Sequence, residues 1–434
     1  MMVYEEAVSY IGEIPKFTTK NSLEHTKECL RRLGDPQEAL QVIHVAGTNG
    51  KGSVCAYLAS IFQEGGYRCG LFTSPHLIRV NERFCIDGEP VGDELFLAAF
   101  EKVKGMIDGL LAEGNCHPSY FETLFLMGMW MFREAKVPYV IMETGLGGRL
   151  DATNAVEHPM ACVITSVSLD HVQYLGDTVE QIAWEKAGII KPGIPVIYDG
   201  NRPETAYVIE KTARQAGAPS YPVTEACVKI QKITSEGIDF TVDGDYAGEV
   251  FTTPFIARYQ VMNGALALRA AELLRERMAF TREQVRNGIA NTKWQGRMEV
   301  IRPGIIVDGA HNDDGVARFI ETAADFQKDH TITLLFAAVD DKDYPDMIRR
   351  ISKGIRPAHV VTAKIKDERA VDAQTLADLF REHGCGQVQA VDNVEEAFMR
   401  ACSQRGDGLL FCVGSLYLVG EIKGLLQEKA GRVG

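Results

Sequence analysis

The sequence lacks the features that mark several common classes of protein. Its ten cysteines include no C-x-x-C pair, so the sequence indicates neither a disulfide framework nor a zinc site, and we expect reduced thiols in a cytoplasmic protein. The longest apolar runs, such as LFLMGMWMF, are too short to cross a bilayer. The first residues carry two early glutamates and no basic segment before an apolar one, which argues against a signal peptide.

Positive charge is also in short supply. The 434 residues include 46 Lys and Arg against 59 Asp and Glu, which gives a formal net charge of −13. Because nucleic acids and anionic membranes favour a basic surface, we expect neither as a partner. Charged residues make up 24% and apolar residues 46%, which is typical of a globular protein, and the length allows two or three domains.

Apolar runs and helical patterns alternate along most of the chain. Runs of strand length occupy residues 40–46, 69–72, 139–143, 161–167 and 194–198. Helical spacing of apolar residues occupies 53–64, 93–107, 119–136, 258–277 and 281–291. This alternation predicts a parallel sheet covered on both faces. Residues 227–252 alternate in polarity instead, which predicts a small antiparallel sheet.

The stretch NTKWQGRMEVIRPG interrupts this pattern. We place a domain boundary near Trp294–Met298 and predict domains at 1–296 and 297–434. Beyond the boundary, further strands are predicted at 305–308, 331–337, 359–363, 387–391 and 409–413. The fold prediction is therefore α/β, with an N-terminal parallel-sheet domain of the P-loop ATPase type and a smaller C-terminal Rossmann-like domain.

The stretch HVAGTNGKGSV, from His44 to Val54, resembles a phosphate-binding loop but lacks the strict Walker A spacing. Gly52 follows Lys51, so the hydroxyl arrives one residue late, at Ser53. The loop joins a predicted strand to a predicted helix, where backbone N–H groups and the helix dipole favour an anion. Lys51 would reach the outer phosphates, and Ser53 could bind Mg²⁺. The alternative is a glycine-rich turn without a ligand.

An acidic residue nearby in the predicted sheet supports a nucleotide site. The buried strand 139–143 ends in Glu143, and nucleotide enzymes place a carboxylate at the end of a neighbouring strand to hold Mg²⁺ or polarise water. The alternative is a solvated acid at a strand end. Glu122 differs, because Ser119 and Glu122 form a capping box that explains this acid structurally.

Several motifs occur in an order that is typical of one family. They are GTNGKGS (47–53), TSPHL (73–77), ETGLGGRLDATN (143–154), SLDH (168–171), EKAGI (185–189) and DGAHN (308–312). Together they resemble folylpolyglutamate synthase/dihydrofolate synthase, a family in the Mur ligase superfamily of ATP-dependent carboxylate–amine ligases. The resemblance extends to GSLYLVGE (414–421) and covers nearly the whole chain. The late hydroxyl at Ser53 is the form that this superfamily uses.

The sequence departs from the family pattern at three places. WQGR (294–297) stands where the family usually has W-P-G-R, and Tyr259-Gln260 stands where it has H-Q, with Asn263 retained. FAAVDDKD (336–343) lacks a Gly that is usual there. These departures affect the expected geometry of the hinge and leave the expected chemistry unchanged.

The resemblance implies that ATP activates the carboxylate of a folate or of dihydropteroate as an acyl phosphate, which the amine of L-glutamate then attacks. It implies Mg²⁺, with K⁺ as a further candidate ion. The implied catalytic residues are Lys51, Glu143, His171 and Lys186. The implied ATP-binding residues, drawn from both domains, are Gly47, Thr48, Asn49, Gly50, Lys51, Gly52, Ser53, Asn263, Arg297, Asp308 and His311. The implied metal ligands are Ser53, Ser74, Glu143, His171 and Lys186. The implied substrate residues are Arg83, Phe121, Asp151, His311 and Ser415.

Some of these residues also have structural explanations. A lone histidine such as His171 is more often a satisfied structural residue than a metal ligand. Phe121 lies on an apolar helix, where core packing is the default, and Arg297 is explained equally well as a surface charge. Under the resemblance, Phe121 would stack on a pterin and Asp151 would accept hydrogen bonds from its amino face.

Lys186 lies in the stretch DTVEQIAWEKAGII, which predicts a helix with Thr178 and Gln181 as a capping box and Gly188 as a stop. Lys186 falls on or beside the apolar face that includes Ile182, where an unpaired ammonium is costly. A lysine that extends to solvent at the helix C-terminus is the alternative. The resemblance implies a carbamate on Lys186, whose two oxygens would suit a second Mg²⁺ beside Glu143 and His171.

The alternative functions are a ligase for UDP-muramyl acids, a nucleotide switch and a kinase. A ligase for UDP-muramyl acids usually carries a UDP-binding domain ahead of the loop, and 46 residues before Gly47 are too few for it. A nucleotide switch would need a base-recognition motif such as N-K-x-D, which is absent, and a kinase would stop at phosphoryl transfer. The sequence does not decide between dihydropteroate and reduced folates as the acceptor. We expect a monomer.

Overall fold

The computed structural model describes residues 3–15, 21–234 and 236–431. The chain forms two compact units. The N-terminal unit comprises Met1–Lys232, Asp239–Pro254 and Val261–Lys293, and the C-terminal unit comprises Ile233–Ile238, Phe255–Gln260 and Trp294–Gly434. The domain boundary between residues 296 and 297 stays a prediction.

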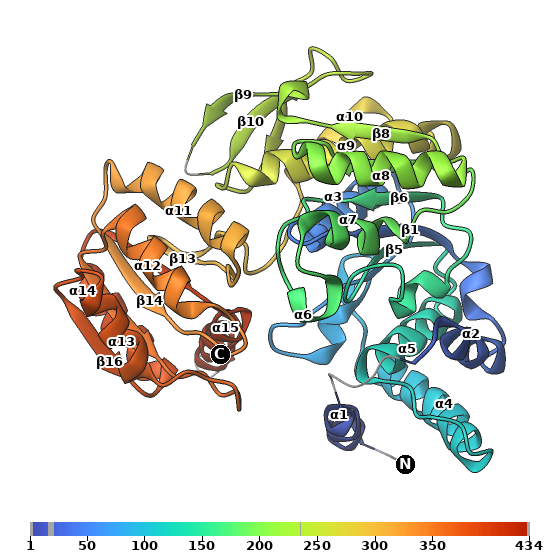
Figure 1. Cartoon of the computed structure of the whole chain (residues 1–434), viewed down its shortest axis with the longest axis horizontal. Coiled ribbons are helices and arrows are strands. Elements are labelled where there is room, and N and C mark those ends of the chain that lie inside the picture. Colours follow the sequence, from blue (N-terminus) through green and yellow to red (C-terminus); the bar gives the residue numbers. More distant parts are fainter. Residues whose placement is uncertain (1–2, 16–20, 235, 432–434) are drawn as a thin grey trace. The chain divides into compact units, whose positions relative to one another are not determined.

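The N-terminal unit is built on a sheet with the strand order β4-β3-β2-β5-β1-β6-β7-β8 (Figure 1). Its strands are β1 (Gln41–Ala46), β2 (Cys69–Phe72), β3 (Phe84–Ile86), β4 (Glu89–Pro90), β5 (Tyr139–Glu143), β6 (Ala161–Ile164), β7 (Val196–Asp199) and β8 (Ser220–Val223). The strands β2, β5, β1, β6, β7 and β8 pair in parallel, as predicted, while β3 is antiparallel to β2 and β4. β6 is shorter than predicted and ends at Ile164, because Thr165 and Ser166 form hydrogen bonds with the phosphate loop.

Helices cover both faces of this sheet. They are α1 (Tyr4–Glu13), α2 (Leu23–Arg32), α3 (Lys51–Glu64), α4 (Asp93–Ala112), α5 (Tyr120–Glu134), α6 (Val172–Leu175), α7 (Val179–Ala187), α8 (Pro203–Ala216), α9 (Tyr259–Met278) and α10 (Arg282–Ala290). One core cluster joins α1, α2, α4 and α5 to Val42, Phe72 and Val140. Another joins α7 and α8 to Ile164 and Val196. The predicted capping boxes of α5 and α7 are both present.

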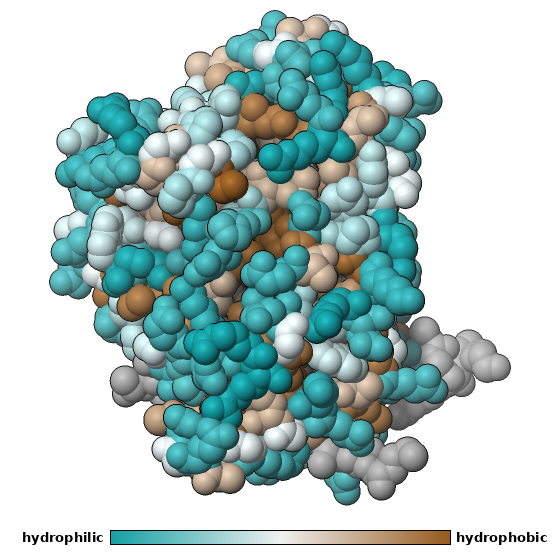
Figure 2. Space-filling view, turned by 90° about the vertical axis from the view of Figure 1, so that its right-hand side faces the viewer, coloured by the Kyte–Doolittle hydropathy of each residue, from teal (hydrophilic) through white to brown (hydrophobic). Residues whose placement is uncertain are grey.

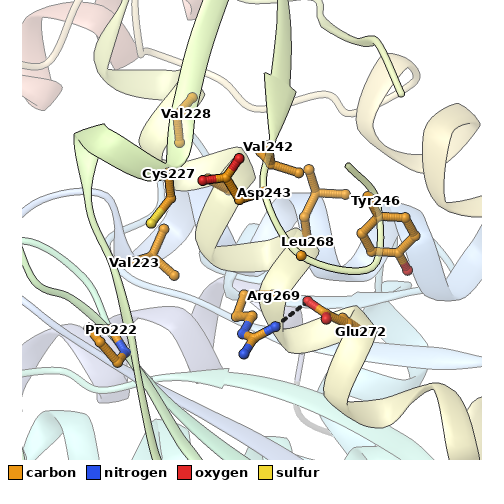
Figure 3. A pocket seen from close by; sticks show the side chains of 12 residues that line it. Pro222, Val223, Cys227, Val228, Val242, Asp243, Tyr246, Leu268, Arg269 and Glu272 are labelled. Atoms are coloured by element: carbon orange, nitrogen blue, oxygen red, sulfur yellow. Dashed lines mark hydrogen bonds and ion pairs between the residues drawn. The ribbon is translucent and has the colours of Figure 1, made fainter. Parts of the chain in front are cut away.

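A small sheet adjoins α9 in the N-terminal unit. It contains β9 (Val228–Ile233), β10 (Ile238–Val242) and β11 (Phe251–Thr253) in the order β11-β10-β9. Beside it lies a pocket of about 180 Å³, in which Arg269 and Glu272 pair at 2.6 Å (Figure 3). The residues that line this pocket include none of the predicted functional residues.

The C-terminal unit has a second sheet with the order β12-β13-β17-β14-β15-β16. Its strands are β12 (Glu299–Arg302), β13 (Ile305–Val307), β14 (Ile332–Phe336), β15 (His359–Ala363), β16 (Val388–Val391) and β17 (Leu409–Val413). Its helices are α11 (Asp313–Gln327), α12 (Tyr344–Ile355), α13 (Ala373–Glu382), α14 (Val394–Arg405) and α15 (Leu416–Gly431). Only the edge pair β12–β13 is antiparallel among these pairs. The predicted second α/β fold is confirmed.

The surface agrees with the acidic, polar composition. On the face that Figure 2 shows, hydrophilic residues predominate, and hydrophobic residues are visible in small groups between them. Across residues 3–15, 21–234 and 236–431, no helix combines the length and the apolar character that a bilayer crossing requires.

Candidate active site

The predicted nucleotide-binding elements meet at the carboxyl ends of adjacent strands. The four strands lie in the order β2-β5-β1-β6. β2 is followed by the loop with Ser74, and β5 ends in Glu143. β1 is followed by the phosphate loop from Gly47, and β6 by the loop from Thr165. Ligands of open α/β sheets bind at this edge, because the loops and the helix N-termini gather there. The fold therefore brings together residues that lie far apart in the sequence.

The phosphate loop needs its glycines for two reasons. Gly47 and Gly50 have φ angles of 150° and 87°, which disfavour residues with a side chain. A Cβ atom would also lie 1.8 Å from Thr165 Oγ1 at Gly47 and 2.3 Å from Asn263 Oδ1 at Gly50. The loop is thus enclosed by neighbouring side chains, and Asn263 of α9 contacts it as the resemblance implies.

Residues after β6 hold this loop in place. Thr48 N donates to Ser166 O at 2.7 Å, and the Thr48 hydroxyl donates to Ser168 O at 3.1 Å. The Thr165 hydroxyl donates to Asn49 O at 2.6 Å. The loop is therefore held by hydrogen bonds that the Thr48 N–H and hydroxyl donate and that the Asn49 carbonyl accepts. Sequence reasoning missed Thr165 and Ser166, although small polar residues directly after a buried strand are a usable signal.

Lys51 and Glu143 lie close together at the start of α3. Lys51 Nζ is 3.8 Å from Glu143 Oε1 and donates to Thr48 O at 3.0 Å. Glu143 is 4% exposed, and its Oε2 accepts a hydrogen bond from Ser74 N at 3.1 Å. A buried carboxylate beside a lysine and a helix N-terminus is chemically suited to a site where phosphate and a divalent cation meet.

Lys186 is buried and points into this region, not to solvent. It is 3% exposed, and Nζ donates to Gly47 O at 2.7 Å. Burial lowers the pKa of its ammonium group to about 7, and repulsion from Lys51 adds to the effect, while Asp170 and Asp151 oppose it. A substantial part of this lysine is therefore the neutral amine near neutral pH. The alternative of an extended, solvated lysine is wrong for this structure.

The loop from Thr144 to Leu150 packs tightly on the helix that carries Lys186. Arg149 N donates to Glu185 O at 2.7 Å, and the Arg149 guanidinium pairs with the Glu185 carboxylate at 2.8 Å. A Cβ atom at Gly148 would lie 2.8 Å from Lys186 O. The glycines of the GLGG motif thus permit close contact between this loop and α7.

Asp151 and Phe121 have clear contacts within the chain. The Asp151 carboxylate accepts from Leu146 N at 2.8 Å and from the backbone N–H and the hydroxyl of Thr153. Phe121 packs 5.8 Å from the Phe72 ring and lies against Gly145. Both residues therefore shape the loop that follows Glu143. Their contact with a pterin stays a prediction.

His171 lies in the loop that leads into α6. It adopts a left-handed backbone with a φ angle of 50°, and its Nε2 is 3.8 Å from Asp170 Oδ1. Among the described residues, no three His, Cys, Asp or Glu side chains gather at one point. Mg²⁺ at nucleotide sites usually takes one or two carboxylates and fills its shell with water and phosphate oxygens, so Glu143 and the Ser53 hydroxyl fit such an ion.

Arg83 is buried beside the loop after β2. Its Nε lies 2.8 Å from His76 Nδ1, and its guanidinium is 5.6 Å from the centre of the Tyr120 ring. It is 6% exposed. A buried guanidinium within reach of the Ser74 loop retains the charge to bind a carboxylate, and this role stays a prediction.

In the C-terminal unit, the loops after β13 and β17 meet. A Cβ atom at Gly309 would lie 2.3 Å from Arg297 Nη1 and 2.3 Å from Leu416 Cδ2. His311 Nδ1 is 2.7 Å from Gly309 O, and the Ser415 hydroxyl accepts from Tyr417 N at 3.1 Å. The fold therefore gathers Arg297, Asp308, His311 and Ser415 at one edge of the second sheet.

Comparison with known proteins decides the family. Residues 296–416 match the model of the Mur ligase glutamate ligase domain. Over 433 residues the chain is 36% identical to the dihydrofolate synthase/folylpolyglutamate synthase of Bacillus subtilis, and the match covers 98% of this chain and 99% of that relative. The chain belongs to the folylpolyglutamate synthase/dihydrofolate synthase family.

Solved structures of this family share the fold. The folylpolyglutamate synthase of Thermotoga maritima superposes with a TM-score of 0.85 at 29% identity, covering 98% of this chain and 96% of that one. The structure of E. coli FolC in complex with DHPP and ADP gives a TM-score of 0.84 at 27% identity and covers 99% of each chain. The resemblance that the motifs predicted is confirmed.

Proposed function

We propose that this protein is an ATP-dependent ligase that joins the amino group of L-glutamate to the carboxylate of a folate or of dihydropteroate. The observation that carries the proposal is the meeting of the phosphate loop, Lys51 and Glu143 at one edge of the sheet, in a chain of this family. The complex of E. coli FolC with DHPP and ADP supports the choice of substrates.

The reaction follows from the chemistry of a carboxylate, which is a poor electrophile. A carboxylate oxygen attacks the γ-phosphorus of ATP, the bond to ADP breaks, and an acyl phosphate forms. The amine of glutamate attacks the acyl carbon, a tetrahedral intermediate collapses, and phosphate leaves with the carboxylate oxygen while the nitrogen loses a proton. Several anions must approach one another, so cationic groups stabilise both transition states.

Lys51 supplies such a cation in this proposal. Its hydrogen bond to Thr48 O and its 3.8 Å approach to Glu143 hold Nζ at the phosphate loop. The backbone N–H groups at the start of α3 provide the positive end of the helix dipole, which also favours a phosphate. Asn263 of α9 lies against Gly50 of the phosphate loop and is a proposed nucleotide contact. Arg297 and His311 are the proposed nucleotide contacts in the C-terminal unit.

The proposed divalent cation is Mg²⁺, held by Glu143 and Ser53, with Ser74 and His171 as further candidate ligands. When bound, it would neutralise the charge that develops on the transferred phosphoryl group. The hydrogen bond from Ser74 N and the burial of the side chain fix the position of the Glu143 carboxylate. K⁺ stays a further candidate.

Lys186 is proposed to carry a carbamate. Its neutral amine can attack CO₂ to form an N–C bond with loss of a proton, and burial favours that neutral amine. The product is an anion with two oxygens, which suits a site that binds metal ions. In its charged form, unmodified Lys186 would be a buried cation that Lys51 repels.

Lys186→Ala tests this role. We expect the variant to lose most ligase activity, and short-chain carboxylates such as acetate to restore part of it by occupying the vacated site. With ¹³C-bicarbonate, the wild type should show a carbamate carbon signal in NMR spectra that Lys186→Ala lacks. A Lys186 that stays unmodified in saturating bicarbonate and Mg²⁺-nucleotide would contradict the proposal.

Phosphate release measured with each substrate left out in turn tests the function as a whole. Release should require L-glutamate together with dihydropteroate or tetrahydrofolate, and the two acceptors compared side by side will show which is preferred. Release that depends on a UDP-muramyl acid instead, or that needs no acceptor, would contradict the proposal.

A further inference from the structure

Asp308, at the end of β13, has a buried carboxylate surrounded by donors of the C-terminal unit. Its Oδ2 accepts from Met298 N at 2.8 Å and from the Tyr259 hydroxyl at 3.4 Å, and its Oδ1 accepts from Ala310 N at 2.8 Å. The residue is 4% exposed. Burial raises the pKa of this carboxyl group, and Arg297 and the three donors oppose the rise.

Two of these donors belong to the segments that connect the two units. Tyr259 lies in Phe255–Gln260, which leads without a break into the part of α9 that belongs to the N-terminal unit. Met298 lies shortly after Lys293, where the chain returns to the C-terminal unit. A single carboxylate therefore accepts hydrogen bonds from two of the segments at which the chain passes from one unit to the other.

Met298 has an unusual backbone that requires such support. Its φ angle is 47°, in the left-handed region, which is unfavourable for a residue with a Cβ atom. Its side chain is 1% exposed and packs in the C-terminal core with Ile256 and Ala257. The hydrogen bond to Asp308 fixes the amide of this strained residue.

The turn around Met298 is fixed from its other side as well. Gly309 N donates to Gly296 O at 2.9 Å, and Gly296 N donates to Glu299 Oε2 at 2.7 Å. Lys423 in turn pairs with Glu299 at 2.6 Å. The connecting segment is therefore part of a defined hydrogen-bonded structure inside the C-terminal unit.

We propose that Asp308 is a positioning residue that clasps two connecting segments, Phe255–Gln260 and the turn around Met298, and that this clasp keeps their backbone in the conformation that ligation requires. The effect on turnover rests on the proposed function, but the clasp itself does not. The clasp consists of hydrogen bonds from groups of the chain itself, which separates it from the nucleotide contact that the resemblance implies for this residue.

Asp308→Asn tests the clasp with little change in shape. The amide leaves one acceptor oxygen and places an NH₂ group against Met298 N–H or Ala310 N–H. In the nucleotide-free protein, the amides of 294–299 should exchange hydrogen with solvent about tenfold faster than in the wild type. The kcat for ligation should fall about tenfold, while the Kd for ATP, measured by titration, should change less than about threefold.

Tyr259→Phe removes a single donor and keeps the packed ring. It should speed exchange at 255–260 and lower kcat less than Asp308→Asn does. Tyr198→Phe is the matched control, because the Tyr198 hydroxyl donates to the Glu210 carboxylate at 2.6 Å in the N-terminal unit. We expect this control to leave exchange at 255–260 and 294–299 and the kcat unchanged.

The outcomes separate the alternatives. Unchanged exchange at 294–299 in Asp308→Asn, with a loss confined to ATP affinity, would overturn the clasp and leave a nucleotide contact. A lowered Tm with unchanged kcat would also overturn it, because the role would then be structural alone. If Asp308→Asn does not fold, hydrogen exchange at 255–260 and the kcat of Tyr259→Phe test the clasp, and no change in either would overturn it. If the wild type shows no glutamate-dependent turnover, the proposed function fails, while the exchange data still decide the clasp.

Discussion

Lys51 is the residue on which the proposed phosphoryl transfer depends most. It is the first residue of α3, and its ammonium lies between the loop carbonyl of Thr48 and the carboxylate of Glu143. If it stabilises charge in the transition state, Lys51→Ala should cost about 3–4 kcal/mol, a rate loss of about 10²–10³. Steady-state phosphate release measures this loss.

The control for that experiment is Lys104→Ala. Lys104 pairs with Asp108 on the surface of α4, so its loss should leave the rate unchanged. Thermal unfolding of Lys51→Ala should stay close to that of the wild type, because the loop is not part of the core. Activity of Lys51→Ala within threefold of the wild type would remove Lys51 from the mechanism.

His44 in β1 predicts a dependence of stability on pH. Its Nε2 lies 2.8 Å from Thr153 Oγ1, which itself donates to Asp151, so the histidine donates at Nε2 and its buried Nδ1 has no hydrogen-bond partner. Burial, with a smaller contribution from Lys191, lowers the pKa of His44 to about 3. Between this value and about 6.5, the unfolded chain binds a proton that the folded chain does not, so stability falls as pH falls.

The matching experiment compares the wild type with His44→Gln. From pH 7 to pH 5, this histidine should reduce the free energy of unfolding by about 2 kcal/mol in the wild type, and the variant should lack that part of the loss. Urea unfolding at both pH values measures the difference. Parallel pH dependences in the two proteins would show that His44 is protonated in the folded state.

For single residues, the sequence predicts a functional role where the residue belongs to a motif. It does not predict contacts between residues that are distant in the sequence and close in the fold. Lys51, Ser53 and Glu143 follow from the loop and from the strand end. The hydrogen bonds that connect His44 to Thr153 and Thr153 to Asp151 join segments 109 positions apart, and no local sequence pattern predicts them. The Asp308 clasp was missed for the same reason, because its donors lie in separate segments.

Among the elements, α7 links sequence to site most directly. Its capping box, in which Gln181 N donates to the Thr178 hydroxyl at 3.3 Å, fixes the start of the helix that carries Lys186 in its last turn. Thr178→Ala should cost about 1 kcal/mol of stability. Because α7 carries Lys186, the ligation rate should also fall, by up to about fivefold if the whole cost appears in the transition state.

Thr281→Ala provides the comparison, since Thr281 makes the same capping box at the start of α10. Both variants should lose similar stability in chemical denaturation, and only Thr178→Ala should lose activity at a temperature where both are folded. Equal activities in the two variants would show that the ordering of α7 does not limit the reaction.

The elements themselves were largely predictable, because buried parallel strands give continuous apolar runs. β1, β2 and β5 stand within a residue of their predicted bounds. The prediction extended β6 to residue 167, whereas the strand ends at Ile164 and the polar groups of Thr165 and Ser166 bind the phosphate loop. Phe255–Gln260 in the C-terminal unit was not predicted, since membership of a unit depends on tertiary contacts such as those of Ile256 and Ala257.

At the scale of the whole molecule, two α/β units carry separate parts of the proposed chemistry. The N-terminal unit holds the phosphate loop, Glu143 and Lys186, and the C-terminal unit holds Arg297, His311 and Ser415. The order of motifs along the chain predicted the family, because most of these motifs follow the end of a strand and EKAGI lies at the end of α7. The sequence does not determine which folate is preferred, since the predicted pterin contacts, Phe121 and Asp151, also have structural roles.

The central claim is that this site activates a carboxylate with ATP and transfers it to glutamate. The most direct test uses dihydropteroate or tetrahydrofolate with ¹⁸O in the reacting carboxylate, together with ATP, Mg²⁺ and L-glutamate. Mass spectrometry should find one ¹⁸O atom in the released phosphate and a product extended by one glutamate, with both signals strongly reduced in Lys51→Ala. Phosphate that carries no ¹⁸O, or that is released without a glutamylated product, would contradict the account.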